Sequence, residues 1–180
     1  MGNTITAEVL KKAKKIKLVI FDVDGVLTDG GLYFTDDGRE MKKFNVKDGL
    51  GISLLIKHHI EVAVITGRNS VIVADRMRSL GVNHVYQGRL NKLETYENLK
   101  SALQIDDQHV AFVGDDLIDI PIMDCCGLPV AVADAHDSVI AKACWVTSKK
   151  GGEGAARQVC DVLLSSHAIE VNGYEFTGQQ

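Results

Sequence analysis

The sequence predicts a doubly wound α/β domain built on a parallel sheet, and two observations carry that prediction. Short apolar runs rich in β-branched residues alternate along the chain with longer stretches of helical periodicity. This alternation is typical of a parallel sheet with right-handed crossovers and helices on both faces. Nearly every position within the short runs is apolar, as expected of strands that are buried on both sides.

The predicted strands and helices follow one another in order. Strands are expected at 17–21, 61–65, 82–86, 109–113, 128–132 and 144–147. Helices are expected at about 49–59, 69–80, 91–104, 117–125, 136–143 and 153–166. We assign the whole chain, 1–180, to a single domain without linker or internal repeat, and treat about 167–180 as a C-terminal tail that frays or reaches a neighbour.

One segment departs from the alternation. Residues 31–35 and 39–44 flank Asp36-Asp37-Gly38, and a DG turn between two strand-like runs predicts a β-hairpin. This insertion, about 31–44, would project from the end of the first strand. No insertion is long enough for a cap domain, so a site at that strand end would be covered by the hairpin or by another subunit.

Composition and charge exclude several functional classes. The 180-residue chain has a formal net charge of −4, which disfavours nucleic acid and anionic membrane surfaces as partners. No run approaches the ~20 apolar residues of a membrane span, and residues 1–17 do not resemble a signal peptide. The four cysteines form no CxxC pair. Reduced thiols are the expected state, and we expect a cytoplasmic protein.

Polar residues gather where the predicted strands end. They are Asp22 and Asp24 after the first strand, Thr66 after the second, Lys92 beyond the third, and Asp115, Asp116 and Asp119 after the fourth. Parallel strands present their carboxyl ends at one edge of the sheet, where ligands bind. Carboxylates crowded there would repel one another without a cation, and ligands that are all oxygen suit Mg²⁺. The sequence therefore predicts a magnesium site.

The first two acidic residues have the chemistry for phosphoryl transfer. A carboxylate can attack phosphorus, which makes Asp22 the candidate nucleophile. A second carboxyl group, that of Asp24, can protonate the leaving oxygen and then activate water. Thr66 would hydrogen-bond the phosphoryl oxygens, and Lys92 would neutralise charge during transfer.

Four segments resemble the motifs of the haloacid dehalogenase superfamily in order and spacing. They are DVDGVLTDG (22–30), ITGR (65–68), Lys92 and GDDLID (114–119). The resemblance implies a Rossmann-like fold and the same roles for Asp22 and Asp24. It also implies that Mg²⁺ is held by the Asp22 carboxylate, the Asp24 carbonyl and Asp115, with Asp116 or Asp119 supporting through water.

A closer resemblance covers nearly the whole chain. DGGLYFTDDGREMKKFNVKDGLGI (29–52), YQGRLNK (86–92), GDDLIDIPIM (114–123), VAVADAH (130–136) and GGEGAARQVCD (151–161) look like the family of 3-deoxy-D-manno-octulosonate (KDO) 8-phosphate phosphatases. That family is capless and tetrameric, its hairpins form a shared barrel, and its subunits help to cover one another's sites. The resemblance implies hydrolysis of the 8-phosphate of an eight-carbon sugar acid destined for lipopolysaccharide.

The same resemblance implies a set of substrate-binding residues. They are Asp24, Asn45, Val46, Lys47, Asp48, Gly49, Gly67, Arg68, Arg76 and Lys92. A sugar acid phosphate has two anionic ends, so positive charge at two places in the pocket is expected. Ser53 is a departure, because some relatives are expected to carry arginine there.

Several alternatives stay open at this point. A phosphatase of a nine-carbon sugar acid 9-phosphate is the hardest to separate, because that substrate also combines a carboxylate with a distant phosphate. A phospho-receiver domain fits poorly, since its acidic pair is adjacent and its phosphorylated Asp follows the third strand. A binding protein that has lost activity is a third alternative. Gly151 and Gly152 are either a simple helix entry or a loop that admits phosphate or a neighbouring chain, with Arg157 facing an active site.

Overall fold

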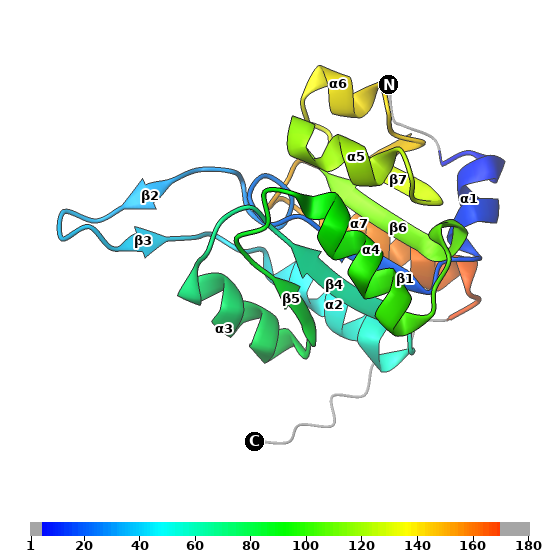
Figure 1. Cartoon of the computed structure of the whole chain (residues 1–180), viewed down its shortest axis with the longest axis horizontal. Helices are drawn as coiled ribbons and strands as arrows, with labels where there is room; N and C mark the ends of the chain where they lie inside the picture. Colours follow the sequence, from blue (N-terminus) through cyan, green and yellow to red (C-terminus); the bar gives the residue numbers. More distant parts are fainter. Residues whose placement is uncertain (1–4, 170–180) are drawn as a thin grey trace.

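A six-stranded parallel sheet forms the centre of the protein, seen here in a computed structural model that describes residues 5–169 (Figure 1). Its strands are β1 (Leu18–Phe21), β4 (Glu61–Ile65), β5 (His84–Tyr86), β6 (Val110–Gly114), β7 (Leu128–Ala131) and β8 (Trp145–Val146). They lie in the order β5-β4-β1-β6-β7-β8, so the chain first builds outward from β1 on one side and then on the other. The predicted doubly wound α/β fold is confirmed.

Helices cover both faces of this sheet. They are α1 (Ala7–Ala13), α2 (Val46–Lys57), α3 (Val71–Leu80), α4 (Lys92–Leu103), α5 (Ile120–Met123), α6 (Asp137–Ile140) and α7 (Ala155–Ser166). α2 packs against α7, α3 and β4, and α7 also contacts α1. α4 and α5 pack together against the opposite face (Figure 1). All four residues of β1 and all five of β6 are buried, as their apolar sequences predicted.

Two short 3₁₀ turns flank β6, one before it and one after it. They are η1 (Asp107–His109) and η2 (Leu117–Asp119). The predicted helix 117–125 is therefore divided into η2 and α5, and Pro121 lies in the first turn of α5, where its missing N–H costs no helical hydrogen bond. The predicted helix 136–143 is shorter than expected, with α6 covering four residues.

Helix α1 has no counterpart among the predicted elements, which began at residue 17. The Thr6 side chain caps it by accepting a hydrogen bond from the Val9 N–H (3.2 Å). Its buried residues, Val9 and Ala13, face α7 and β7. Because five of the nine residues from 7 to 15 are charged, the narrow apolar stripe is a weak periodic signal.

The predicted hairpin is present and projects from the carboxyl-end edge of the sheet (Figure 1). β2 (Tyr33–Phe34) pairs antiparallel with β3 (Glu40–Met41), and the turn closes with a hydrogen bond from the Thr35 N–H to the Arg39 carbonyl (2.9 Å). Gly38 has a φ of 82°, which explains the glycine of the DG turn. The predicted tail beyond residue 169 lies outside the described residues. Within them, no helix combines the length and the apolar character that crossing a bilayer requires.

Candidate active site

The sheet register brings the predicted acidic residues to one place. Phe21 pairs with Val64 of β4 and with Val113 of β6, so Asp22 emerges between the ends of two neighbouring strands. Its N–H donates to the Val113 carbonyl (3.0 Å), which fixes the backbone at this point. Carboxylate oxygens of Asp22, Asp115 and Asp119 lie within 4.8 Å of one another. We call these three residues the acidic cluster.

Lys92 joins two members of the acidic cluster. It is the first residue of α4, and its side chain is fully buried. Its Nζ lies 2.8 Å from Asp22 Oδ1 and donates a hydrogen bond to Asp119 Oδ1 (2.7 Å). Burial by itself lowers the pKa of Lys92, but the carboxylates of Asp22 and Asp119 outweigh burial and the pKa is raised. Lys92 is therefore a permanent positive charge within the cluster.

Asp119 anchors the loop after β6. Its Oδ2 accepts hydrogen bonds from the N–H groups of Asp115 (2.9 Å) and Asp116 (3.2 Å), while Oδ1 is held by Lys92. Asp119 is completely buried. Both of its oxygens are thus engaged by the protein itself, so the residue holds Asp115 and Lys92 in position.

Asp22 and Asp115 carry the excess negative charge of the cluster. Among the described residues, Oδ1 of each is buried without a hydrogen-bond partner, and the contact of Asp22 with Lys92 is an ion pair without hydrogen-bond geometry. Burial raises the pKa of Asp22 to about 6, against the opposing charge of Lys92. Burial, reinforced by the charges of Asp22 and Asp119, raises the pKa of Asp115 to about 8. Buried carboxylate oxygens without hydrogen-bond partners, in a cluster whose oxygens lie within 4.8 Å of one another, fit a divalent cation with oxygen ligands.

A glycine makes room for Asp115. Gly25 has a φ of 90°, and a Cβ on it would lie 2.0 Å from Asp115 Oδ2. Gly151 in turn packs on Gly25, since a Cβ there would lie 1.7 Å from the Gly25 carbonyl oxygen. The Gly152 N–H donates to the Val26 carbonyl (3.0 Å). The loop before α7 is therefore packed onto the loop that follows Asp22.

Asp24 lies apart from the acidic cluster and faces the hairpin. Its Oδ1 contacts the Lys42 ammonium, and its Oδ2 lies 3.9 Å from Arg68 Nε. Glu40 of β3 links the two cations, since its Oε1 is 2.7 Å from Arg68 Nη2 and 3.6 Å from Lys42 Nζ. Neither Lys42 nor Glu40 was predicted as a site residue. Two features of the sequence could have identified them. Both lie in the segment 29–52, and Glu40 and Lys42 are separated by one residue, which places them on one face of a strand.

The other residues predicted at the strand ends lie in different structural environments. Thr66 is buried, and its backbone is fixed between β5 and the next loop by hydrogen bonds to the Tyr86 carbonyl and from the Arg89 N–H (both 2.9 Å). Gly67 lies beside the exposed side chains of Leu90 and Ile118. Asp116 is exposed, and its Oδ1 accepts from the Leu117 N–H (2.7 Å) in a capping box with Asp119. Its side chain is not among those of the acidic cluster.

The predicted sugar-binding segment forms the start of α2. The Asn45 side chain caps the helix by accepting from the Lys47 N–H (2.9 Å), which explains why α2 begins at Val46 and not at the predicted 49. Val46 and Lys47 are exposed. Asp48 is buried, and its Oδ1 accepts from the Arg157 N–H (2.7 Å), in the first turn of α7. The Arg157 guanidinium pairs with Asp161 (2.7 Å) of its own helix.

Arg76 reaches this segment from α3. A Cβ at Gly49 would lie 2.3 Å from Arg76 Nη2, so the guanidinium lies directly on that glycine. Asn45, Asp48, Gly49 and Arg76 together line a small cavity with Leu27, Phe44, Ile52, Met77 and Leu80. Ser53, the departure from the expected pattern, donates to the Leu80 carbonyl (3.4 Å) and joins α2 to α3. The predicted substrate residues thus form two groups, one at the acidic cluster and one around the start of α2.

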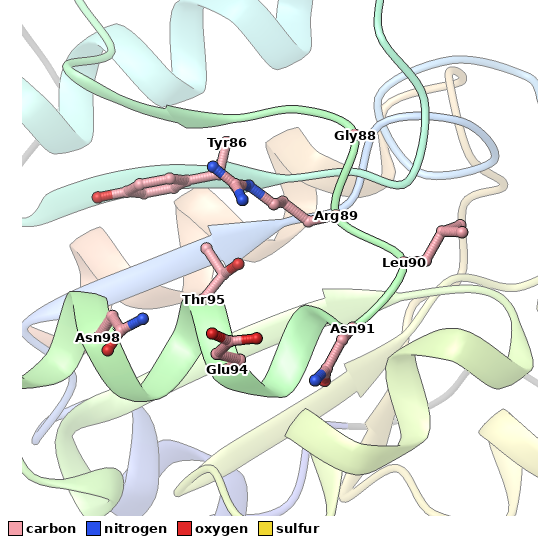
Figure 2. A pocket seen from close by; sticks show the side chains of 8 residues that line it. All are labelled: Tyr86, Gly88, Arg89, Leu90, Asn91, Glu94, Thr95 and Asn98. Carbon is pink, nitrogen blue, oxygen red and sulfur yellow. The ribbon is translucent and has the colours of Figure 1, made fainter.

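A separate hollow lies between β5, the loop that follows it and α4 (Figure 2). It is lined by Tyr86, Gly88, Arg89, Leu90, Asn91, Glu94, Thr95 and Asn98. Figure 2 shows the Arg89 side chain extending toward Tyr86 from the loop between β5 and α4. None of the predicted site residues lines this hollow, so it does not form part of the acidic site.

The fold and the acidic site define the class of the protein as a haloacid dehalogenase-like hydrolase, and the family model of that description matches residues 81–159. The chain is 52% identical over 160 residues to the 3-deoxy-D-manno-octulosonate 8-phosphate phosphatase KdsC of Escherichia coli K12, covering 89% of this chain and 85% of that protein. The chain therefore belongs to the family of 3-deoxy-D-manno-octulosonate 8-phosphate phosphatases.

Solved structures agree with this assignment. The phosphatase of that name from Yersinia pestis matches with a TM-score of 0.89 and 48% identity, covering 91% of this chain and 88% of that chain. The Moraxella catarrhalis phosphatase, solved in complex with a magnesium ion, a phosphate ion and a KDO molecule, matches with a TM-score of 0.88 and 39% identity, covering 89% and 92%.

Proposed function

We propose that this protein is a Mg²⁺-dependent phosphatase that hydrolyses KDO 8-phosphate to the free sugar acid and phosphate, a step in lipopolysaccharide biosynthesis. The observation that carries the proposal is that Asp22, at the switch point of the sheet, forms an ion pair with a buried lysine and shares a cluster with Asp115, whose buried Oδ1 has no hydrogen-bond partner. The identity of 52% to a curated KDO 8-phosphate phosphatase supports the substrate.

The reaction would proceed in two displacements at phosphorus. In the first, an Asp22 carboxylate oxygen bonds to phosphorus as the bond from phosphorus to the sugar oxygen breaks, and Asp24 gives that oxygen its proton. In the second, Asp24 takes a proton from water, the water oxygen bonds to phosphorus, and the bond to Asp22 breaks. Lys92 neutralises charge on the phosphoryl group, and the Thr66 hydroxyl would donate a hydrogen bond to a phosphoryl oxygen.

The carboxylates of Asp22 and Asp115, each with a buried oxygen that has no hydrogen-bond partner, would hold Mg²⁺. The Asp24 carbonyl would complete the set of protein ligands, and Asp116 or Asp119 would support the ion through water. When bound, Mg²⁺ offsets the repulsion between phosphate and carboxylate. The Asp119 carboxylate accepts three hydrogen bonds from the protein. Its contribution to the metal site would therefore be mainly to position Asp115.

The sugar acid would be bound by positive charge at two places. Arg68, together with Gly67 and Lys92, lies beside Asp24 and the acidic cluster. Arg76 lies near the start of α2 with the segment 45–49. A nine-carbon sugar acid 9-phosphate remains the second candidate substrate, because it presents the same two charged ends.

We propose a homotetramer assembled through the hairpin, in which a neighbouring subunit helps to cover the site. The hairpin exposes four large apolar side chains to solvent, those of Leu32, Tyr33, Phe34 and Met41. Apolar side chains gathered on a projecting element are typical of an interface. A cytoplasmic location is supported by cysteines that are all free.

Steady-state phosphate release from a small substrate panel tests the function. The panel contains KDO 8-phosphate, a nine-carbon sugar acid 9-phosphate and a hexose phosphate, each measured with Mg²⁺ and with a chelator. We expect a preference for the eight-carbon substrate that disappears when metal is removed. Better turnover of the nine-carbon compound would make that compound the assigned substrate. Absence of turnover with every compound would contradict the phosphatase function.

A further inference from the structure

Lys42 is buried on a hairpin whose neighbouring side chains face solvent. It follows β3, and its side chain is 1% exposed. The residues on either side differ sharply, since Met41 is 51% exposed and the Lys43 side chain is 62% exposed. An ammonium group is removed from water only where charged partners compensate for the lost hydration. The partners of Lys42 therefore indicate why this lysine is turned inward.

Those partners are the carboxylates of Asp24 and Glu40. Lys42 Nζ contacts Asp24 Oδ1 and lies 3.6 Å from Glu40 Oε1. Glu40 in turn pairs with Arg68, which follows β4, at 2.7 Å. One Asp24 oxygen is thus held from the hairpin, and the other lies 3.9 Å from Arg68 Nε. A free aspartate side chain would rotate about two bonds, whereas this one is restrained from two elements.

We propose that Lys42 is a positioning residue for Asp24, holding its carboxyl group at the leaving oxygen of the substrate. The proposal rests on the acid/base role that the proposed function gives to Asp24. Lys42 would act by fixing Oδ1, which leaves Oδ2, 3.9 Å from Arg68 Nε, as the oxygen that exchanges the proton. Proton transfer requires the donor within hydrogen-bond reach of the acceptor, so loss of this restraint impairs that step in particular.

Leaving groups of different basicity distinguish positioning of Asp24 from a general structural role. A sugar or alkyl alkoxide needs a proton as it departs, whereas 4-nitrophenolate is stable without one. The ratio kcat/KM reports the steps up to departure of the first product and excludes the later hydrolysis of the phospho-aspartate. A variant that impairs only proton donation by Asp24 therefore lowers kcat/KM for an alkyl phosphate and leaves kcat/KM for 4-nitrophenyl phosphate nearly unchanged.

The experiment compares Lys42→Met, Lys42→Arg and Asp24→Asn with the wild type on KDO 8-phosphate and on 4-nitrophenyl phosphate. We expect Lys42→Met to lower kcat/KM for the sugar phosphate by about 10²-fold, the scale of a misplaced catalytic group, with little change for the nitrophenyl ester. Lys42→Arg, which keeps the charge, recovers part of the loss. Lys43→Met is the matched control, because Lys43 is exposed on the same hairpin and pairs only loosely with Asp29 (3.6 Å).

Three results would overturn the proposal, and a fourth would overturn its premise. Equal losses on both substrates, or a lowered melting temperature, would make Lys42 a structural residue. If Lys42→Met leaves the kinetics unchanged while Asp24→Asn shows a leaving-group dependence, Lys42 has no positioning role and Asp24 is still the acid. If Asp24→Asn itself shows no leaving-group dependence, the assigned role of Asp24 fails, and the proposal for Lys42 fails with it.

Discussion

At the scale of single residues, the pKa values of the acidic cluster depend on the small number of positive charges near its carboxylates. Lys92 is a buried ammonium between Asp22 and Asp119, while Asp115 has no cationic partner among the described residues. This imbalance explains why Asp115 has the higher of the two raised pKa values. It also makes the cluster a site for an added cation.

Asp22→Asn tests the nucleophile directly. The amide is nearly isosteric, but it cannot form an acyl phosphate under these conditions. We expect turnover to fall to background while the circular dichroism spectrum stays unchanged, because Lys92 keeps its hydrogen bond to Asp119 (2.7 Å). Normal turnover in this variant would rule out a phospho-aspartate at Asp22.

Gly25→Ala tests the close fit between the first loop and Asp115. The added methyl would lie 2.0 Å from Asp115 Oδ2, at a φ of 90° that alanine tolerates poorly. We expect a higher Mg²⁺ requirement, measured as the metal concentration for half-maximal activity. Gly38→Ala is the control, since its φ is also positive but nothing lies within 4 Å of its Cβ position. A similar metal requirement in both variants would contradict this account.

At the scale of elements, a carboxylate of α2 caps the start of α7. The Asp48 side chain accepts from the Arg157 N–H (2.7 Å), which is one of the donors without a partner inside helix α7. The two helices also approach closely, because a Cβ at Gly51 would lie 2.9 Å from that of Cys160. The start of α2, where the sugar acid is expected to bind, is therefore held in place by α7.

Asp48→Ala would separate capping from substrate binding. We expect a loss of about 0.5–2 kcal/mol in the free energy of unfolding, measured by urea denaturation, since a partly buried backbone donor at the start of α7 loses its capping partner. Asp48→Asn retains an acceptor oxygen and should lose less. If the alanine variant keeps full stability and only KM rises, Asp48 serves the substrate and not the helix.

At the scale of the whole molecule, the hairpin forms a two-stranded sheet of its own that pairs with no strand of the central sheet in residues 5–169. It extends away from the core and exposes Phe34 to 61%. Phe34→Glu should weaken the proposed tetramer, because a charge would be buried at the interface, and sedimentation velocity would report smaller species. Leu10→Glu is the control, since Leu10 is 44% exposed on α1, at the far end of the sheet. Tetramers that survive in Phe34→Glu would place the interface elsewhere.

The acidic cluster also links pH, metal and global stability. The pKa of Asp115 is raised from 3.8 to about 8, so the metal-free folded state binds more protons than the unfolded chain across that window. Stability of the metal-free protein should therefore fall as pH rises from about 4 to about 8. Mg²⁺ competes with these protons, so its stabilising effect should be larger at about pH 8 than at about pH 5.5.

Melting temperatures with Mg²⁺ and with a chelator at the two pH values measure this linkage. Asp115→Asn removes the titrating group, so the fall in the metal-free melting temperature should become shallower. A stabilisation by Mg²⁺ that is equal at both pH values in the wild type would contradict the coupling.

Much of this arrangement could be predicted from the sequence, and particular residues show why. β1 and β6 are recognisable because nearly every residue is apolar, and the polar residues after them necessarily meet at one edge of a parallel sheet. Helix α1 was missed because charged residues surround its two buried positions. The start of α2 was placed three residues late because the capping side chain of Asn45 was not recognised.

The sequence by itself determined the class of fold, the positions of Asp22, Asp115 and Asp119 at the strand ends, and the chemistry that carboxylates at those positions can perform. These features follow from local periodicity and from the order of strands along the chain. Only the tertiary structure decided that Lys42 meets Asp24, and that Asp48 caps a helix 109 residues further along the chain. Such contacts depend on which way side chains point between packed elements, and that direction is set by long-range packing.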